Sequence, residues 1–173
     1  MTEFASTATG ITLIGMPGAG KSTVGVLLSK RLGLGFIDSD LSIQVRTGQL
    51  LQDIVDQQGY LALREIEQQV LCEIDPQAQV VATGGSAVYS DIAMQHLLQT
   101  STVVYLQTSL AALRDRIEDY DRRGIARRPD QSFESLFEER TALYERYAQV
   151  TVDAGLAAEQ VARTIEQLWR HPR

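Results

Sequence analysis

Short apolar runs alternate along the chain with longer segments in which apolar residues recur every three or four positions. The short runs predict five strands, at residues 11–14, 36–38, 80–82, 102–106 and 150–152. The longer segments predict helices, at 21–32, in pieces between 40 and 74, at 91–99, from 109 to about 121, at 133–147 and at 157–169. Alternating strands and helices favour the α/β class, with a five-stranded parallel sheet between two helical layers.

One hydrophobic core is enough to bury the apolar faces of these predicted strands and helices. The chain has 173 residues, 44% of them hydrophobic, which predicts one domain over residues 1–173. In an open parallel sheet, ligands bind at the carboxyl ends of the strands. Functional residues are therefore expected directly after the predicted strands.

The first predicted strand runs directly into the sequence GMPGAGKS, at residues 15–22. A strand, a glycine-rich turn with this spacing and a helix together form a P-loop, whose backbone N–H groups cradle phosphates. The Lys21 amine would reach the β- and γ-phosphates, and the Ser22 hydroxyl would ligate Mg²⁺. We expect ATP and Mg²⁺ to bind here, with nucleotide contacts from Gly15, Pro17, Gly18, Ala19, Gly20, Lys21, Ser22 and Thr23.

Two absences narrow the class of P-loop protein. The sequence contains no asparagine and therefore lacks the N-K-x-D motif that reads guanine in GTPases. The strand at 80–82 ends without an acidic residue, so the usual Walker B aspartate of motor ATPases is missing there. Asp38, at the end of the second strand, is then the candidate carboxylate for Mg²⁺. A kinase of a small molecule remains.

The net charge and the apolar runs of the sequence indicate which partners and which location to expect. The formal net charge of −6 argues against nucleic acid or an anionic membrane as a partner. No apolar run is long enough to span a membrane, and residues 1–10 lack the basic and apolar regions of an export signal. We expect a cytoplasmic protein, and a monomer.

Several separated motifs, in order, resemble the shikimate kinase family. Residues 36–40 contain the D-x-D pattern of that family, with Asp38 implied in the Mg²⁺ shell and Asp40 in binding the substrate hydroxyls. Asp40 would also accept the proton of the reacting hydroxyl. The resemblance further implies that Arg64 and Arg140 bind the substrate carboxylate. Gly84 and Gly85 match two glycines whose backbone approaches the substrate ring.

The arginine-rich stretch at about 122–132 corresponds by position to the lid of the family. There Arg128 matches an arginine that stabilises the transferring phosphoryl group, so the catalytic set that we predict is Lys21, Asp40 and Arg128. Arg116 aligns with an arginine that packs on adenine. The implied reaction is ATP-dependent phosphorylation of shikimate to shikimate 3-phosphate, a step of aromatic amino-acid biosynthesis.

Three departures from the family pattern lie on the acceptor or lid side. Leu63 replaces a phenylalanine, Ser86 replaces a third glycine, and the lid continues from Arg128 as Pro-Asp-Gln. A kinase of another acceptor, such as a gluconate-type sugar acid or a nucleoside monophosphate, therefore stays open as an alternative. So does a paralogue that binds nucleotides without phosphorylating an acceptor.

Overall fold

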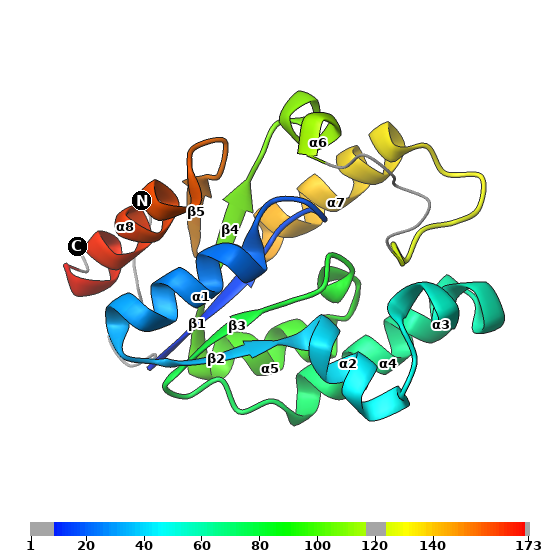
Figure 1. Ribbon diagram of the computed structural model, residues 1–173, viewed down its shortest axis with the longest axis horizontal. Helices are drawn as coiled ribbons and strands as arrows, with labels where there is room; N and C mark the ends of the chain where they lie inside the picture. Colours follow the sequence, from blue (N-terminus) through cyan, green and yellow to red (C-terminus); the bar gives the residue numbers. More distant parts are fainter. Residues whose placement is uncertain (1–8, 117–123, 172–173) are drawn as a thin grey trace.

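A parallel β-sheet forms the centre of the molecule. The computed structural model describes residues 9–116 and 124–171 (Figure 1). The sheet has the strand order β2-β3-β1-β4-β5, and each neighbouring pair is parallel. Its strands are β1 (Gly10–Ile14), β2 (Gly35–Asp38), β3 (Gln79–Ala82), β4 (Ser101–Gln107) and β5 (Val150–Asp153). The prediction of an α/β fold with five parallel strands is confirmed.

Helices cover both faces of the sheet. On one face α1 (Lys21–Leu32) packs against α8 (Ala158–Arg170), and on the other α5 (Asp91–Thr100) and α7 (Phe133–Tyr147) contact β4 (Figure 1). Helix α6 (Leu110–Arg116) follows β4. The rest of the helix predicted to reach about residue 121 lies outside the described residues. In the described ranges, no helix is long and apolar enough to cross a membrane.

The central strands are buried because helices cover them on both sides. The first six of the seven residues of β4 are buried, which explains why its sequence is apolar without alternation. Two buried hydroxyls on adjacent strands, those of Thr12 and Ser101, are hydrogen-bonded to each other at 2.7 Å. The pair therefore avoids the cost of a buried polar group without a partner.

Three further helices form a lobe beside the carboxyl end of β2 (Figure 1). They are α2 (Ser39–Thr47), α3 (Leu51–Gln58) and α4 (Tyr60–Glu73). They share a small apolar cluster of Ile43, Ile54, Leu63, Val70 and Ala126. Ala126 belongs to the described part of the predicted lid, residues 124–132, which we call the lid segment. The lid segment thus packs against the helical lobe.

Candidate active site

The P-loop connects β1, the central strand of the sheet, to the start of α1. Gly15 has φ 148° and Gly20 has φ 92°, conformations that residues with a Cβ rarely adopt. A Cβ on Gly15 would also lie 2.9 Å from the carbonyl oxygen of Leu106. The glycines of the motif are therefore needed for the shape of the turn.

The start of α1 differs from the starts of α2, α5 and α7. In these three helices the side chains of Asp38, Ser90 and Ser132 accept hydrogen bonds from backbone N–H groups of the first turn. Within the described residues, no side chain caps α1, and its first turn contains no acidic residue. Its N–H groups remain available, so this helix end is suited to bind an anion.

Lys21 lies at the base of the loop and is 8% exposed. Its Nζ donates to the carbonyl oxygens of Gly15 and Met16, at 2.7 and 3.0 Å. Burial lowers the pKa of the Lys21 amine to about 8, although the nearby Asp40 carboxylate opposes this shift. The amine is thus mostly protonated at neutral pH and is held beside the place where phosphates would bind.

A cavity of about 410 Å³ opens above the loop. Its walls come from the P-loop, the lobe, the segment after β3, α7 and the lid segment. Predicted site residues that line it are Pro17, Gly18, Gly20, Lys21, Ser22, Thr23, Asp40, Gly84, Gly85, Arg116 and Arg140. Most of the residues predicted from separate motifs are therefore brought to one cavity.

Two carboxylates face Gly84 in this cavity. A Cβ on Gly84 would lie 2.6 Å from Oδ1 of Asp40 and 2.2 Å from Oε1 of Glu67. Burial raises the pKa of Asp40, and it raises the pKa of Glu67 to about 7, with a further contribution from Asp40. Glycine at residue 84 is thus required by the close approach of both side chains.

The second arginine predicted to bind a carboxylate, Arg140, is 1% exposed, and the first, Arg64, is partly buried. The Nη2 atoms of Arg64 and Arg140 donate to the same acceptor, the carbonyl oxygen of Ala126, at 3.1 and 2.8 Å. The Nε atoms of both are buried and have no hydrogen-bond partner in the described parts of the chain. Two guanidinium groups thus converge on one oxygen and retain unused donors, which suits recognition of a carboxylate.

Two functional side chains near this pair were not identified from the sequence. Glu67 lies three residues after Arg64, within the R-x-x-E part of the family pattern, but the pattern alone gives it no role. Tyr89 ends the 3₁₀ helix η1 (Ala87–Tyr89) and contacts both arginines through its ring. No sequence motif includes Tyr89, so only the folded chain reveals it.

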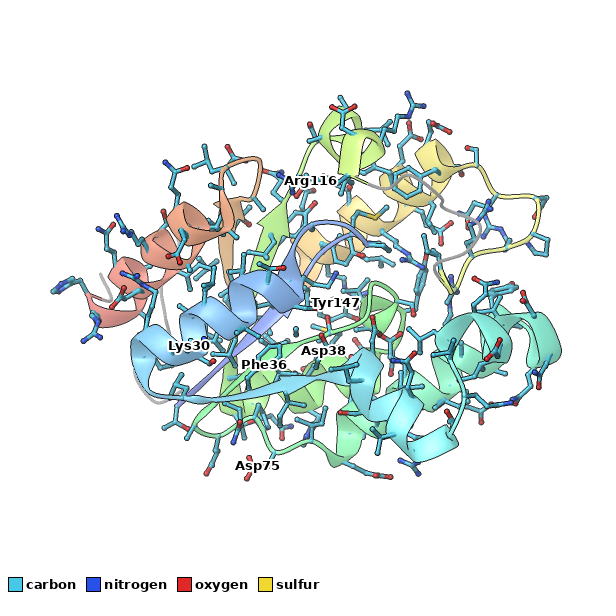
Figure 2. The ribbon with its side chains drawn as sticks, viewed as in Figure 1. Lys30, Phe36, Asp38, Asp75, Arg116 and Tyr147 are labelled. Atoms are coloured by element: carbon cyan, nitrogen blue, oxygen red, sulfur yellow. The ribbon has the colours of Figure 1, made fainter. Side chains whose placement is uncertain are left out.

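Arg116, predicted to pack on adenine, and Arg128, predicted to contact the transferring phosphoryl group, lie in different surroundings. Arg116 lines the main cavity and a second one of about 300 Å³, which Gly18, Gly20 and Thr23 also line. Arg116 is the last residue of α6 (Figure 2), and its Nη2 donates to the carbonyl oxygen of Ala154, the residue after β5, at 3.0 Å.

Arg128 does not line the main cavity, and it is about half exposed. Its Nη2 lies 3.3 Å from Oε2 of Glu139 on α7. The structure thus does not bring Arg128 to the P-loop, because a carboxylate outside the cavity holds it. The prediction that it contacts the phosphoryl group depends on movement of the lid segment.

The side-chain oxygens of Ser22 and Asp38 are suited to bind an Mg²⁺ ion that has few protein ligands. Ser22 is exposed at the start of α1, and Asp38 lies where β2 passes into α2 (Figure 2). Oδ1 of Asp38 accepts the N–H groups of Asp40 and Leu41, at 3.0 and 3.3 Å. No cluster of three metal-ligating side chains occurs in residues 9–116 and 124–171. Mg²⁺ held by phosphates, water and one or two protein oxygens needs no such cluster.

Two departures from the family pattern line the same cavity. Leu63 is buried and belongs to the apolar cluster of the lobe. The hydroxyl of Ser86 donates to Oε2 of Glu67, whose Oε1 has no partner among the described atoms. Ser86 therefore orients an acidic side chain at the acceptor end of the cavity.

Comparisons with known proteins agree with this geometry. The sequence model of the family described as shikimate kinase matches residues 17–169. Shikimate kinase 2 of Photorhabdus laumondii is 33% identical over 163 residues, which cover 90% of this chain and 92% of that protein. Shikimate kinase of Thiobacillus denitrificans is 37% identical, over 82% of this chain and 79% of that protein.

Solved structures give the same result. Shikimate kinase from Acinetobacter baumannii in complex with shikimate has a TM-score of 0.84 and 32% identity, over 95% of this chain and 94% of that one. A gluconokinase from Sinorhizobium meliloti has a TM-score of 0.51 and 20% identity, over 96% and 94%, and so shares the fold alone. The family match covers most of the chain, and one cavity joins the P-loop to Asp40 and the buried Arg140. The chain belongs to the shikimate kinase family.

Proposed function

We propose that the chain transfers the γ-phosphoryl group of ATP to the 3-hydroxyl of shikimate. The observation that carries this proposal is that Arg140 lines the P-loop cavity and shares the carbonyl oxygen of Ala126 with Arg64, which lines the neighbouring cavity. The pair is suited to hold the carboxylate of an acceptor whose hydroxyl faces the phosphates. The structure in complex with shikimate from Acinetobacter baumannii, 32% identical, supports the choice of acceptor.

On the ATP side, the free N–H groups of the loop and of α1 would bind the phosphate oxygens. Lys21 would exchange the carbonyls of Gly15 and Met16 for the β- and γ-phosphates. Its charge then offsets the negative charge that develops on the transferring group. Arg116 lines the second cavity, which we assign to the adenine base.

On the acceptor side, the hydroxyl oxygen forms the new bond to phosphorus while the bond to the leaving ADP oxygen breaks. Asp40 would accept the proton of that hydroxyl. Burial raises the pKa of Asp40, which makes the carboxylate a better base while leaving it near Lys21. Gly84 allows the acceptor to approach Asp40 closely because it has no side chain.

Ser22 and Asp38 are the residues that would hold Mg²⁺. Bound Mg²⁺ supplies positive charge to the β- and γ-phosphate oxygens. We also propose that closure of the lid segment moves Arg128 from Glu139 toward the phosphates. The cytoplasmic location and monomeric state predicted from the sequence remain part of this proposal.

The test is ADP release from Mg-ATP, measured with a coupled assay in the presence of shikimate, gluconate, a nucleoside monophosphate or no acceptor. We expect saturable turnover that depends on shikimate. Turnover with gluconate instead would mean that Leu63 and Ser86 mark a changed acceptor. Nucleotide binding with no turnover for any acceptor would overturn the proposal in favour of a non-catalytic paralogue.

A further inference from the structure

The ring of Tyr89 contacts both arginines of the proposed carboxylate site. The Cζ atom of Arg64 lies 3.5 Å from the centre of the ring, and that of Arg140 lies 5.4 Å from it. Tyr60, on α4, is a more distant neighbour, 5.1 Å from the Cζ atom of Arg64. An aromatic face attracts a guanidinium ion electrostatically, and the attraction grows when water is excluded. Tyr89 therefore stabilises two like charges that the fold brings close together.

The position of this ring is itself fixed. The Tyr89 hydroxyl donates to Oε1 of Glu139 on α7. Oε2 of Glu139 accepts a hydrogen bond of 2.8 Å from Nε2 of Gln131 in the lid segment. It also lies 3.3 Å from Nη2 of Arg128. The ring is thus attached at its hydroxyl to α7, and at its face it contacts the arginines.

The Nη2 atoms of both arginines donate to the carbonyl oxygen of Ala126, whereas their Nε atoms have other surroundings. All N–H groups of a guanidinium lie in its plane, whereas a cation–π contact uses its face. The Nε atoms of Arg64 and Arg140 are buried without a partner in the chain as described. Tyr89 can therefore hold Arg64 through its face while the Nε donors of both groups stay available for an acid.

We infer that Tyr89 is a positioning residue that orients Arg64 and Arg140 for the carboxylate of the acceptor. Without the ring, Arg64 would lose its nearest aromatic contact and could adopt other rotamers, so binding would have to order it again. Tyr89 should therefore contribute to the preference for an acid over an uncharged acceptor. The inference rests on the proposed function, because it concerns the acceptor of that reaction.

The experiment measures the affinities of two ligands by calorimetry, with no turnover needed. The ligands are shikimate and the analogue whose carboxylate is reduced to an alcohol. The variants are Tyr89→Leu, which removes the ring, and Tyr89→Phe, which keeps the ring but loses the bond to Glu139. Tyr60→Leu is the matched control, because Tyr60 lies farther from the same guanidinium. Thermal unfolding verifies that each variant is folded.

We expect Tyr89→Leu to weaken shikimate binding about tenfold and to leave binding of the alcohol unchanged within about twofold. Tyr89→Phe and Tyr60→Leu should keep most of the preference for the acid. Equal weakening of both ligands by Tyr89→Leu would indicate a merely structural role and overturn the inference. An unchanged preference for the acid would overturn it as well.

Failure of the proposed function can be distinguished from failure of the inference about Tyr89. If the wild type binds shikimate in preference to the alcohol but releases no ADP with it, the proposed reaction is wrong while the role of Tyr89 is still decided by the binding ratio. If the wild type shows no preference for the acid, the inference is overturned, whatever the turnover assay gives.

Discussion

The ATP side and the acceptor side of the cavity are built in different ways. The phosphate-binding part of the ATP side comes from one continuous stretch, residues 15–23, which runs from the end of β1 into the first turn of α1. The acceptor side combines Asp40 from α2, Glu67 from α4, Gly84 after β3 and Arg140 from α7. A short continuous motif carries its own geometry, whereas the second group depends on how α2, α4, β3 and α7 pack against one another. Variation in sequence is therefore expected to affect the acceptor side first.

The two sides also differ in how they handle charge. At the loop, free N–H groups and an uncapped helix supply positive potential, and Lys21 is the one buried ionisable side chain there. At the acceptor side, the ionisable side chains of Arg140 and Glu67 are almost fully buried, at 1% and 2% exposure. Burial of charge costs free energy unless the group is paired. The acceptor side is thus the less stable part of the site before its ligand binds.

The largest expected effect is on the ATP side. Lys21→Met should lower kcat about a thousandfold, because it removes the charge beside the transferring group. Lys30→Met is the matched control, since Lys30 is the only other lysine of the sequence and is exposed at the far end of α1 (Figure 2). Single-turnover kinetics would measure both. A Lys21→Met variant with more than about a tenth of the wild-type rate would contradict the assigned role.

The second prediction concerns the buried Glu67. Because its pKa is raised from 4.5 to about 7, the folded state binds the proton more tightly than the unfolded state. The stability of the ligand-free protein should therefore fall between about pH 4.5 and pH 7, by about 3 kcal/mol. In Glu67→Gln this loss should disappear. Urea unfolding at pH 5 and pH 8 measures it.

Glu73→Gln provides the control for that measurement, because Glu73 lies on the same helix and its side chain is 66% exposed. Its effect on the free energy of unfolding should be small, as for exposed charges in general. A Glu67→Gln variant whose difference from the wild type is the same at pH 5 and pH 8 would show that the carboxyl group of Glu67 is not perturbed.

The third prediction separates the two sides directly. Arg64→Lys should raise KM for shikimate about thirtyfold, because an ammonium group cannot reproduce the planar donors of a guanidinium. KM for ATP should change by less than about twofold. Steady-state kinetics with each substrate varied provides the measurement, with the exposed Arg46→Lys as control. An increase in KM for ATP instead would contradict the assignment of Arg64 to binding of the acceptor.

The smallest effect is expected at the surface, away from both sides. Arg46 and Glu73 form an ion pair of 2.8 Å, with side chains 43% and 66% exposed. Arg46→Ala should change the free energy of unfolding by about 0.5 kcal/mol or less, and less still at high salt. Thermal unfolding at two salt concentrations measures this. A change well above 1 kcal/mol would contradict the expectation that exposed ion pairs contribute little to the stability of this fold.

Much of the fold could be predicted because its signals are local. Apolar runs located the five strands, and Gly48 and Gly59 correctly divided the helices of the lobe. The P-loop was predictable for the same reason. The positions of Asp40 and Arg140 around one cavity required the family pattern, since an aspartate or arginine on a helix has no distinctive local signal.

The remaining features depend on contacts distant in sequence. Tyr89 acquires its place through Arg64 and through Glu139, which is 50 residues away. Arg128 was expected to face the phosphates, but the structure pairs it with Glu139 as well. Glu67 was part of a recognised pattern, yet only its burial and its contact with Ser86 show its importance. Such pairings depend on tertiary packing, which no local pattern reports.

The most direct test of the account follows the phosphoryl group itself. Wild-type protein is incubated with Mg-ATP and either shikimate or its methyl ester, and the products are followed by phosphorus NMR. The account predicts a phosphate ester on the 3-hydroxyl of shikimate, with ADP formed in equal amount, and much slower formation from the ester, which lacks the negative charge. Equal rates for shikimate and its methyl ester, or ADP formation without a phosphate ester, would contradict it.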